Sequence, residues 1–171
     1  LYPTGGGTGL IGMWKAFAEL EALGWLEHPR KPRLISCQSD GCAPIAAAFE
    51  AGERFAEPAT DPDTIASGIR VPVAVGDFMI LDAVRESGGA ARAADEAKLA
   101  EWMRQANALE GIALCPEAAA CLDVLAGLVA RNEVDPDEHI VVFNTGAAQK
   151  YVEAIAVDLP TVAPPVDYAA L

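Results

Sequence analysis

The sequence predicts an α/β fold with three layers, in which helices flank a mostly parallel β-sheet. Short apolar segments alternate with helical patterns along the 171-residue chain, as in proteins built from strand–helix–strand units. The segment at residues 139–143, His-Ile-Val-Val-Phe, is apolar on both faces, which is typical of a strand that helices cover on each side. In such sheets, ligands bind where the strands end.

The expected elements follow one another with short connections. Strands are predicted at residues 33–38, 90–94, 112–115 and 139–143, and helices at residues 9–24, 43–51, 77–87, 95–110 and 117–132.

Local signals support these elements in order. The first helix carries one apolar stripe, formed by Leu10, Met13, Trp14, Phe17 and Leu20. Gly52 ends the second helix, Asp95 is placed to cap the fourth, and Pro116 is placed at the start of the fifth. Residues 64–75 are apolar but interrupted by glycine and proline, so they are expected to form an irregular covering segment.

Composition is compatible with one folded domain. The chain is 52% hydrophobic, enough to bury a sizeable core, and the domain is expected to span residues 1–151. Residues 152–171, rich in proline toward their end, are expected to form an extended tail. The spacing of the four cysteines matches no zinc site, so no metal is expected and all four are interpreted as buried thiols: Cys37, Cys42, Cys115 and Cys121.

The charge of the chain argues against two classes of partner. With 12 basic and 25 acidic residues, the formal net charge is −13, which disfavours a nucleic-acid or anionic-membrane surface. No apolar run approaches the roughly 20 residues that a membrane span needs. A soluble protein of the cytoplasm is therefore expected.

The most distinctive motif is the glycine-rich turn Thr4-Gly5-Gly6-Gly7-Thr8-Gly9, which leads directly into the first helix. Glycines allow the backbone to approach an anion closely, and the helix N-terminus adds partial positive charge. The turn is therefore predicted to hold a phosphate group. A plain glycine-rich connection is the alternative, because short glycine clusters are common in turns.

Two familiar nucleotide motifs fit this turn poorly. Gly7-Thr8-Gly9-Leu10-Ile11-Gly12 matches the dinucleotide fingerprint in letters, but the acid that would hold the ribose falls near Glu27, in a linker. A nucleoside triphosphate loop needs a lysine followed by serine or threonine after the glycines, and this chain has Leu10-Ile11 there. A smaller phosphate ligand, such as pyridoxal phosphate, fits better.

Five motifs in order resemble the threonine synthases, which belong to the fold-type II, tryptophan synthase β-like enzymes that use pyridoxal phosphate. They are residues 2–17, Gly41-Cys42-Ala43-Pro44-Ile45, residues 66–72, Cys115-Pro116-Glu117 and Phe143-Asn144-Thr145-Gly146. The resemblance implies that the chain is the C-terminal part of such an enzyme's large domain, with a small amino-acid substrate. It also makes a homodimer plausible.

The resemblance assigns roles to matching residues. It implies that the cofactor phosphate lies on Gly5, Gly6, Gly7, Thr8 and Gly9. It implies that the Thr145 hydroxyl contacts the pyridine nitrogen and that Gly68 belongs to a segment closing over the ring, whereas a simple turn hydroxyl is the alternative for Thr145. Arg70, beside that segment, is a candidate to bind a substrate phosphate, or an ordinary exposed arginine.

Two departures from the family pattern stand out. The family reads Pro-Glu-Gly-Ala where this chain has Ala118 after Glu117, and a carboxylate is favoured in a first helical turn by the helix dipole alone. The lysine that carries the cofactor lies upstream of the glycine turn in the family, and none of the lysines here matches it: Lys15, Lys31, Lys98 and Lys150. The chain alone is therefore expected to be inactive.

The implied reaction is the conversion of O-phosphohomoserine and water to threonine and phosphate. A serine or threonine dehydratase and a β-replacement synthase of the same fold remain alternatives. A domain that binds a phosphate ligand without catalysis is the alternative of another class.

Overall fold

The computed structural model describes residues 1–28 and 30–154, and it contains the predicted parallel sheet. Three strands, β1 (Tyr2–Pro3), β2 (Ile35–Ser39) and β3 (Ala90–Ala94), pair in the order β1-β2-β3, and both pairings are parallel. Tyr2 lies opposite Ser36, and Ile35 lies opposite Ala90. All five residues of the central strand β2 are buried, as expected for a strand covered on both faces.

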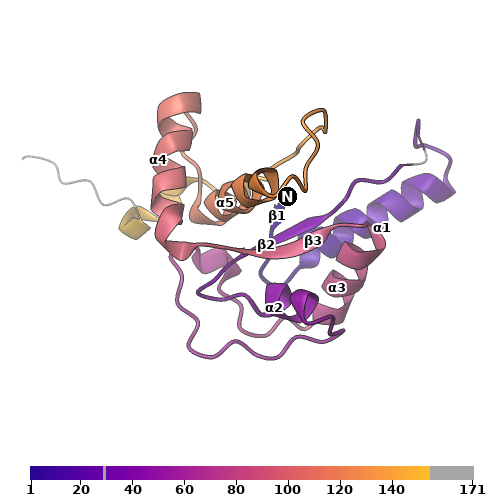
Figure 1. Cartoon of the computed structure of the whole chain (residues 1–171), viewed down its shortest axis with the longest axis horizontal. Coiled ribbons are helices and arrows are strands. Elements are labelled where there is room, and N and C mark those ends of the chain that lie inside the picture. The colour runs from indigo at the N-terminus through magenta and orange to yellow at the C-terminus, as the bar shows by residue number, and fades with distance from the viewer. Residues whose placement is uncertain (29, 155–171) are drawn as a thin grey trace, which may run out of the picture.

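Helices cover both faces of the sheet (Figure 1). The five α-helices are α1 (Thr8–Ala22), α2 (Pro44–Glu50), α3 (Asp77–Glu86), α4 (Leu99–Glu110) and α5 (Pro116–Ala130). Figure 1 shows α4 and α5 on one side of the sheet and α2 and α3 on the other. The three-layer architecture is confirmed.

Each face of the sheet has its own apolar core. On the α5 side, the core contains Ile35 and Cys37 of β2 together with the alanine-rich start of α5. On the other side, Leu34 and Ala91 pack with Leu10 of α1 and with the apolar face of α3. Two cores separated by one sheet are what the alternating pattern predicts.

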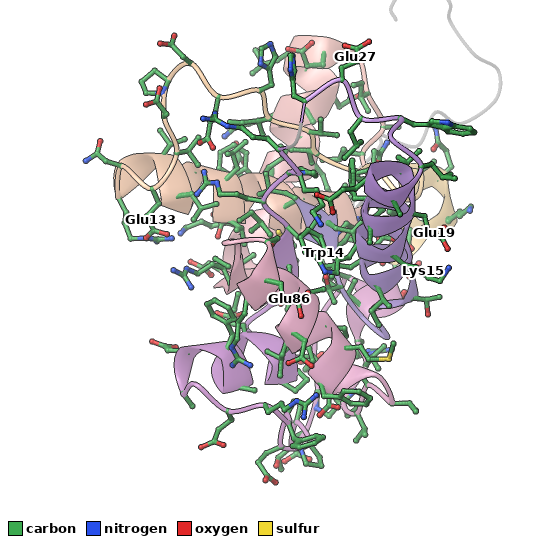
Figure 2. All side chains as sticks on the ribbon, turned by 90° about the vertical axis from the view of Figure 1, so that its right-hand side faces the viewer. Trp14, Lys15, Glu19, Glu27, Glu86 and Glu133 are labelled. Atoms are coloured by element: carbon green, nitrogen blue, oxygen red, sulfur yellow. The ribbon has the colours of Figure 1, made fainter. Side chains whose placement is uncertain are left out.

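A polar contact at the surface joins α1 to α3. Figure 2 shows Trp14 on α1 and Glu86 on α3 pointing toward one another, and the indole N–H donates a 2.9 Å hydrogen bond to Oε2 of Glu86. The ammonium group of Lys31 lies 5.1 Å from the centre of the Trp14 ring, a distance that suits a cation–π contact. Lys15 and Glu19, also labelled in Figure 2, form an ion pair one turn apart on the exposed side of α1.

Two predicted strands are not strands in the structure. Residues 112–115 form only an isolated antiparallel bridge between Leu114 and Ala147. Gly111, with a positive φ of 66°, caps the end of α4, and only four residues separate it from Pro116, where α5 begins. This connection is too short to cross a sheet and return.

The second is the apolar run at residues 139–143, which extends beside Leu1. The amino group of Leu1 donates to the Val141 carbonyl at 2.7 Å, and the Phe143 N–H donates to the Leu1 carbonyl at 3.2 Å. Within the described part of the chain, no further backbone hydrogen bond continues this pairing, because β1 has only two residues. Val141 is consequently 62% exposed, not buried as predicted.

The C-terminal segment is described only at its start. Residues 152–154 form a short 3-10 helix (Val152–Ala154), and the rest of the predicted tail, residues 155–171, lies outside the described residues. The division into a domain at 1–151 and a tail at 152–171 stays a prediction. No described helix combines the length and apolar character needed to cross a membrane.

Candidate functional site

The glycine loop, residues 4–9, lies between the carboxyl end of β1 and the first turn of α1. Within the described residues, the N–H groups from Gly5 to Leu10 donate no hydrogen bond to the protein. No acidic side chain occupies the first turn of α1, and no side chain caps it. A row of free N–H donors at a helix N-terminus is the arrangement that binds phosphate.

The glycines of the loop differ in whether packing inside the protein requires them. A Cβ on Gly7 would lie 2.2 Å from Cδ1 of Ile80, and a Cβ on Gly9 would lie 1.9 Å from the Tyr2 hydroxyl. These two glycines are therefore required by packing within the protein. A Cβ on Gly6 would meet no protein atom within 4 Å, so internal packing does not explain this glycine. Gly6 and Thr8 are both exposed.

The covering segment, residues 64–71 of the predicted stretch 64–75, lies against the glycine loop. It contains the 3-10 turn η1 (Ser67–Ile69), and a Cβ on Gly5 would lie 3.0 Å from the Gly68 carbonyl oxygen and 2.9 Å from Cγ2 of Val71. Gly5 thus permits the loop and the segment to touch. The resemblance implies that Gly68 belongs to a segment closing over the cofactor ring, and that role stays a prediction.

Two carboxylates hold the covering segment in place. Glu96, just after β3, accepts hydrogen bonds from the Thr64 hydroxyl at 2.6 Å and the Ile65 N–H at 2.7 Å. Glu117, in the first turn of α5, accepts one from the Gly68 N–H at 2.7 Å and is only 3% exposed. The segment is irregular yet fixed at both of these points.

Thr145 lies in the turn after residues 139–143, beside Cys115 at the start of α5. The Cys115 thiol donates to Oδ1 of Asn144 at 3.5 Å, and a Cβ on Gly146 would lie 3.3 Å from Cβ of Cys115. Burial raises the pKa of the Cys115 thiol; the nearby Glu117 carboxylate raises it further, while the Ala118 N–H and the Thr145 hydroxyl lower it. Thr145 itself is exposed and available to a ligand.

A series of neighbouring residues leads from the glycine loop to the turn that contains Thr145. Gly5 touches Gly68, Gly68 bonds to Glu117, and Glu117 neighbours Cys115, which contacts the turn at Thr145. The glycine loop, which follows the carboxyl end of β1, is the member of this series that a parallel sheet places at a ligand-binding edge.

Arg70 lies at the exposed end of the covering segment. Among the described residues it forms no ion pair. Arg70 also affects the Cys42 thiol. Burial raises the pKa of this thiol, whereas the Val71 N–H and the positive charge of the Arg70 guanidinium lower it. All four cysteines are buried free thiols, as predicted.

Two supporting residues were missed from the sequence. Gln38 and Glu96 make several hydrogen bonds to backbone near the loop and the covering segment. A glutamine in an otherwise buried strand was a signal for the first. No local sequence pattern indicated a role for Glu96, because its hydrogen-bond partners, Thr64 and Ile65, lie more than thirty residues away in the sequence.

A family profile described as "Pyridoxal-phosphate dependent enzyme" matches residues 1–146. The chain belongs to this family. Its members use pyridoxal phosphate, and the free N–H donors of the glycine loop fit the phosphate of that cofactor. The loop also carries no acid in the first turn of α1 that would repel it.

Curated relatives agree with this assignment, and a solved structure shares the fold. Threonine synthase of Methanocaldococcus jannaschii is 32% identical over 90% of this chain and 38% of its own length. Cysteate synthase of Methanoculleus marisnigri is 33% identical over 83% of this chain and 35% of its own. L-serine ammonia-lyase from Rhizomucor miehei shares the fold, with a TM-score of 0.64, 21% identity, and coverage of 89% of this chain and 48% of that structure. The chain spans about two-fifths of the length of the curated relatives it matches.

Proposed function

We propose that residues 1–151 are part of the large domain of a lyase that uses pyridoxal phosphate to convert O-phosphohomoserine and water into threonine and phosphate. The observation that carries this is the loop of unpaired N–H groups from Gly5 to Leu10, joined by contacts to Gly68 and the Thr145 turn. Threonine synthases of M. jannaschii and Mycobacterium leprae, 32% and 30% identical to this chain, support the choice of reaction.

Each group would have a defined task. The N–H groups of Gly5, Gly6, Gly7, Thr8 and Gly9 would hold the cofactor phosphate, and Thr145 would accept or donate a hydrogen bond at the pyridine nitrogen. When bound, pyridoxal phosphate supplies the electron sink for elimination and replacement at the β and γ carbons. A neutral hydroxyl at Thr145 does not hold a proton on the ring nitrogen as a carboxylate would.

The substrate would lie beside the covering segment. Gly68 is exposed and its N–H is held by Glu117, so the backbone of that segment would lie over the cofactor ring in a fixed position. Arg70, exposed and without an ion-pair partner among residues 1–28 and 30–154, would bind the phosphate of the substrate through its planar guanidinium.

The lysine that carries the cofactor is proposed to lie outside this chain. Lys15 pairs with Glu19, Lys31 with Glu21, and Lys98 with Asp95, all in ion pairs at the surface. Among the described residues, no hydrogen bond or ion pair joins these three lysines to the glycine loop, and the chain covers only part of its relatives' length. We expect the 171-residue chain by itself to be inactive.

A β-replacement synthase is the second candidate, because the 33% identical relative from M. marisnigri is a cysteate synthase. The protein expressed from its complete reading frame, with pyridoxal phosphate, should release inorganic phosphate from O-phosphohomoserine. Formation of cysteate, with no release of phosphate from O-phosphohomoserine, would favour the second candidate. Failure to bind pyridoxal phosphate would overturn both and leave a non-catalytic domain.

A further inference from the structure

Gln38 is a fully buried polar residue at the heart of the sheet. It lies in β2 with 0% exposure, and its side chain makes three hydrogen bonds to backbone atoms. Its Oε1 accepts from the N–H groups of Ile45, at 2.9 Å, and Ala46, at 3.1 Å. Its Nε2 donates to the carbonyl oxygen of Thr4 at 3.1 Å.

These partners leave one orientation for the amide. Two N–H donors require the carbonyl oxygen of the side chain, and the Thr4 carbonyl requires its NH₂ group. Gln38 therefore joins the start of α2 to the start of the glycine loop. Thr4 is held at its other end as well, because its N–H donates to the Cys37 carbonyl at 2.8 Å.

Fixing the Thr4 carbonyl also fixes the next N–H. The carbonyl of Thr4 and the N–H of Gly5 belong to one planar trans peptide, so they point in opposite directions. While the carbonyl points toward Gln38 in the core, the Gly5 N–H must point away from Gln38. That N–H has no protein partner among the described residues, although Gly5 is buried.

We propose that Gln38 is a positioning residue for the phosphate site: by holding the Thr4 carbonyl, it aims the Gly5 N–H at the phosphate of the bound cofactor. The proposal rests on the proposed function of the glycine loop. A buried, unpaired N–H costs free energy unless a ligand satisfies it, and a charged phosphate oxygen is a strong acceptor for it. Gln38 does not touch the cofactor in this arrangement.

Gln38→Glu is the variant that separates the two halves of this network. It retains an acceptor for the Ile45 and Ala46 N–H groups, but in its ionised form it has no proton to donate to the Thr4 carbonyl and repels it. Because burial raises the pKa of a carboxyl, binding is measured at alkaline as well as neutral pH, and the ionised form is the one that tests the proposal. Ser36→Ala is the matched control, because Ser36 lies on the same face of β2, is 0% exposed, and its hydroxyl has no hydrogen-bond partner within the described residues.

The measurement compares pyridoxal phosphate with pyridoxal, which lacks the phosphate. Dissociation constants are obtained by titrating the protein, expressed from its complete reading frame, and following the cofactor absorbance. For Gln38→Glu, we expect the affinity for pyridoxal phosphate to fall about tenfold or more, from the loss of one hydrogen bond to a charged group, with little change for pyridoxal. Ser36→Ala should change neither.

The comparison distinguishes positioning from a structural role. Equal losses for both ligands, or no loss for pyridoxal phosphate, would overturn the proposal while leaving the proposed function intact. If the wild-type protein binds neither ligand, the proposed function fails and this inference fails with it. If circular dichroism shows that Gln38→Glu does not fold, Gln38→Leu is tested against the same criteria.

Discussion

The backbone N–H of Gly68 donates a 2.7 Å hydrogen bond to Oε1 of Glu117, which is 49 residues away in sequence. The bond ties the covering segment to the first turn of α5. No Cβ fits at Gly68, since it would lie 2.8 Å from the same Oε1 atom. The close approach of Glu117 thus depends on glycine at position 68. The hydrogen bond also gives Glu117 a role besides its favourable interaction with the helix dipole.

Replacing Glu117 with alanine should destabilise the protein. The change leaves the Gly68 N–H without its acceptor, so the free energy of unfolding should fall by about 1–3 kcal/mol in urea titrations. Glu117→Gln retains an acceptor oxygen at the same place and should cost less. Equal losses for the two variants would show that the hydrogen bond to Gly68 contributes nothing.

Gly6 and Gly12 form a matched pair for testing the phosphate site. A Cβ meets no protein atom within 4 Å at either position. Gly6→Ala should leave stability within about 0.5 kcal/mol but weaken binding of pyridoxal phosphate, because the methyl group would occupy space beside the ligand. Gly12→Ala, inside α1, should raise stability by about 0.5–1 kcal/mol and leave binding unchanged.

Thermal or urea unfolding and cofactor titration together check this pair. The prediction is contradicted if both variants bind pyridoxal phosphate as the wild type does. It is also contradicted if Gly12→Ala weakens binding as much as Gly6→Ala.

The helices and the buried strands could be predicted because local pattern and tertiary environment agree there. Residues 95–110 were expected as one helix capped by Asp95, and the Asp95 side chain does accept from the Ala97 N–H, although the first turn is a separate 3-10 turn, η2 (Glu96–Lys98), before α4. The apolar run at 139–143 shows the limit of this reasoning. Strand pairing depends on a neighbour, and the two residues of β1 provide too little of one.

The site was partly predictable for a similar reason. Adjacent glycines before a helix indicate a phosphate loop, and the structure places that loop at a strand end. The sequence could not show which glycine faces a ligand. A side chain on Gly7 would collide with Ile80, and one on Gly9 would collide with the Tyr2 hydroxyl, and only the structure shows these two contacts. The contacts of Gln38 are likewise set by the packing of β2 against α2 and the loop, and no local pattern encodes them.

Thr145 is predicted to affect the cofactor and not the fold. Its side chain is exposed, so Thr145→Ala should leave the free energy of unfolding within about 0.5 kcal/mol. Loss of one hydrogen bond at the pyridine nitrogen should weaken pyridoxal phosphate binding about fivefold, and should weaken pyridoxal equally, since both ligands carry the ring.

Thr145→Ser retains the hydroxyl and should bind both ligands nearly as the wild type does. The ratio of the two dissociation constants therefore separates Thr145 from Gln38, whose variant should affect only the phosphorylated ligand. Thr145→Ala with unchanged affinity for both would refute the assignment.

Tyr151 should make stability depend on pH in the alkaline range. Burial, and secondarily the neighbouring Glu117 carboxylate, raise the pKa of Tyr151 from 10.0 to about 12. The folded state thus keeps the phenol proton that the unfolded chain loses earlier. The stabilisation linked to this group is complete below pH 10 and disappears as the pH rises toward about 12.

Tyr151→Phe removes the ionisable group but keeps the ring, so it isolates this effect. The wild-type protein should lose stability relative to Tyr151→Phe as the pH increases from about 9 to about 11, measured as urea unfolding midpoints in parallel titrations. Glu117→Gln should reduce the slope without abolishing it, because desolvation of the phenol is the larger cause of the raised pKa. A difference between wild type and Tyr151→Phe that stays constant across this range would mean that the Tyr151 phenol is solvated as in the unfolded chain, and that the packing of Tyr151 near Gly146 and Glu117 does not persist in solution.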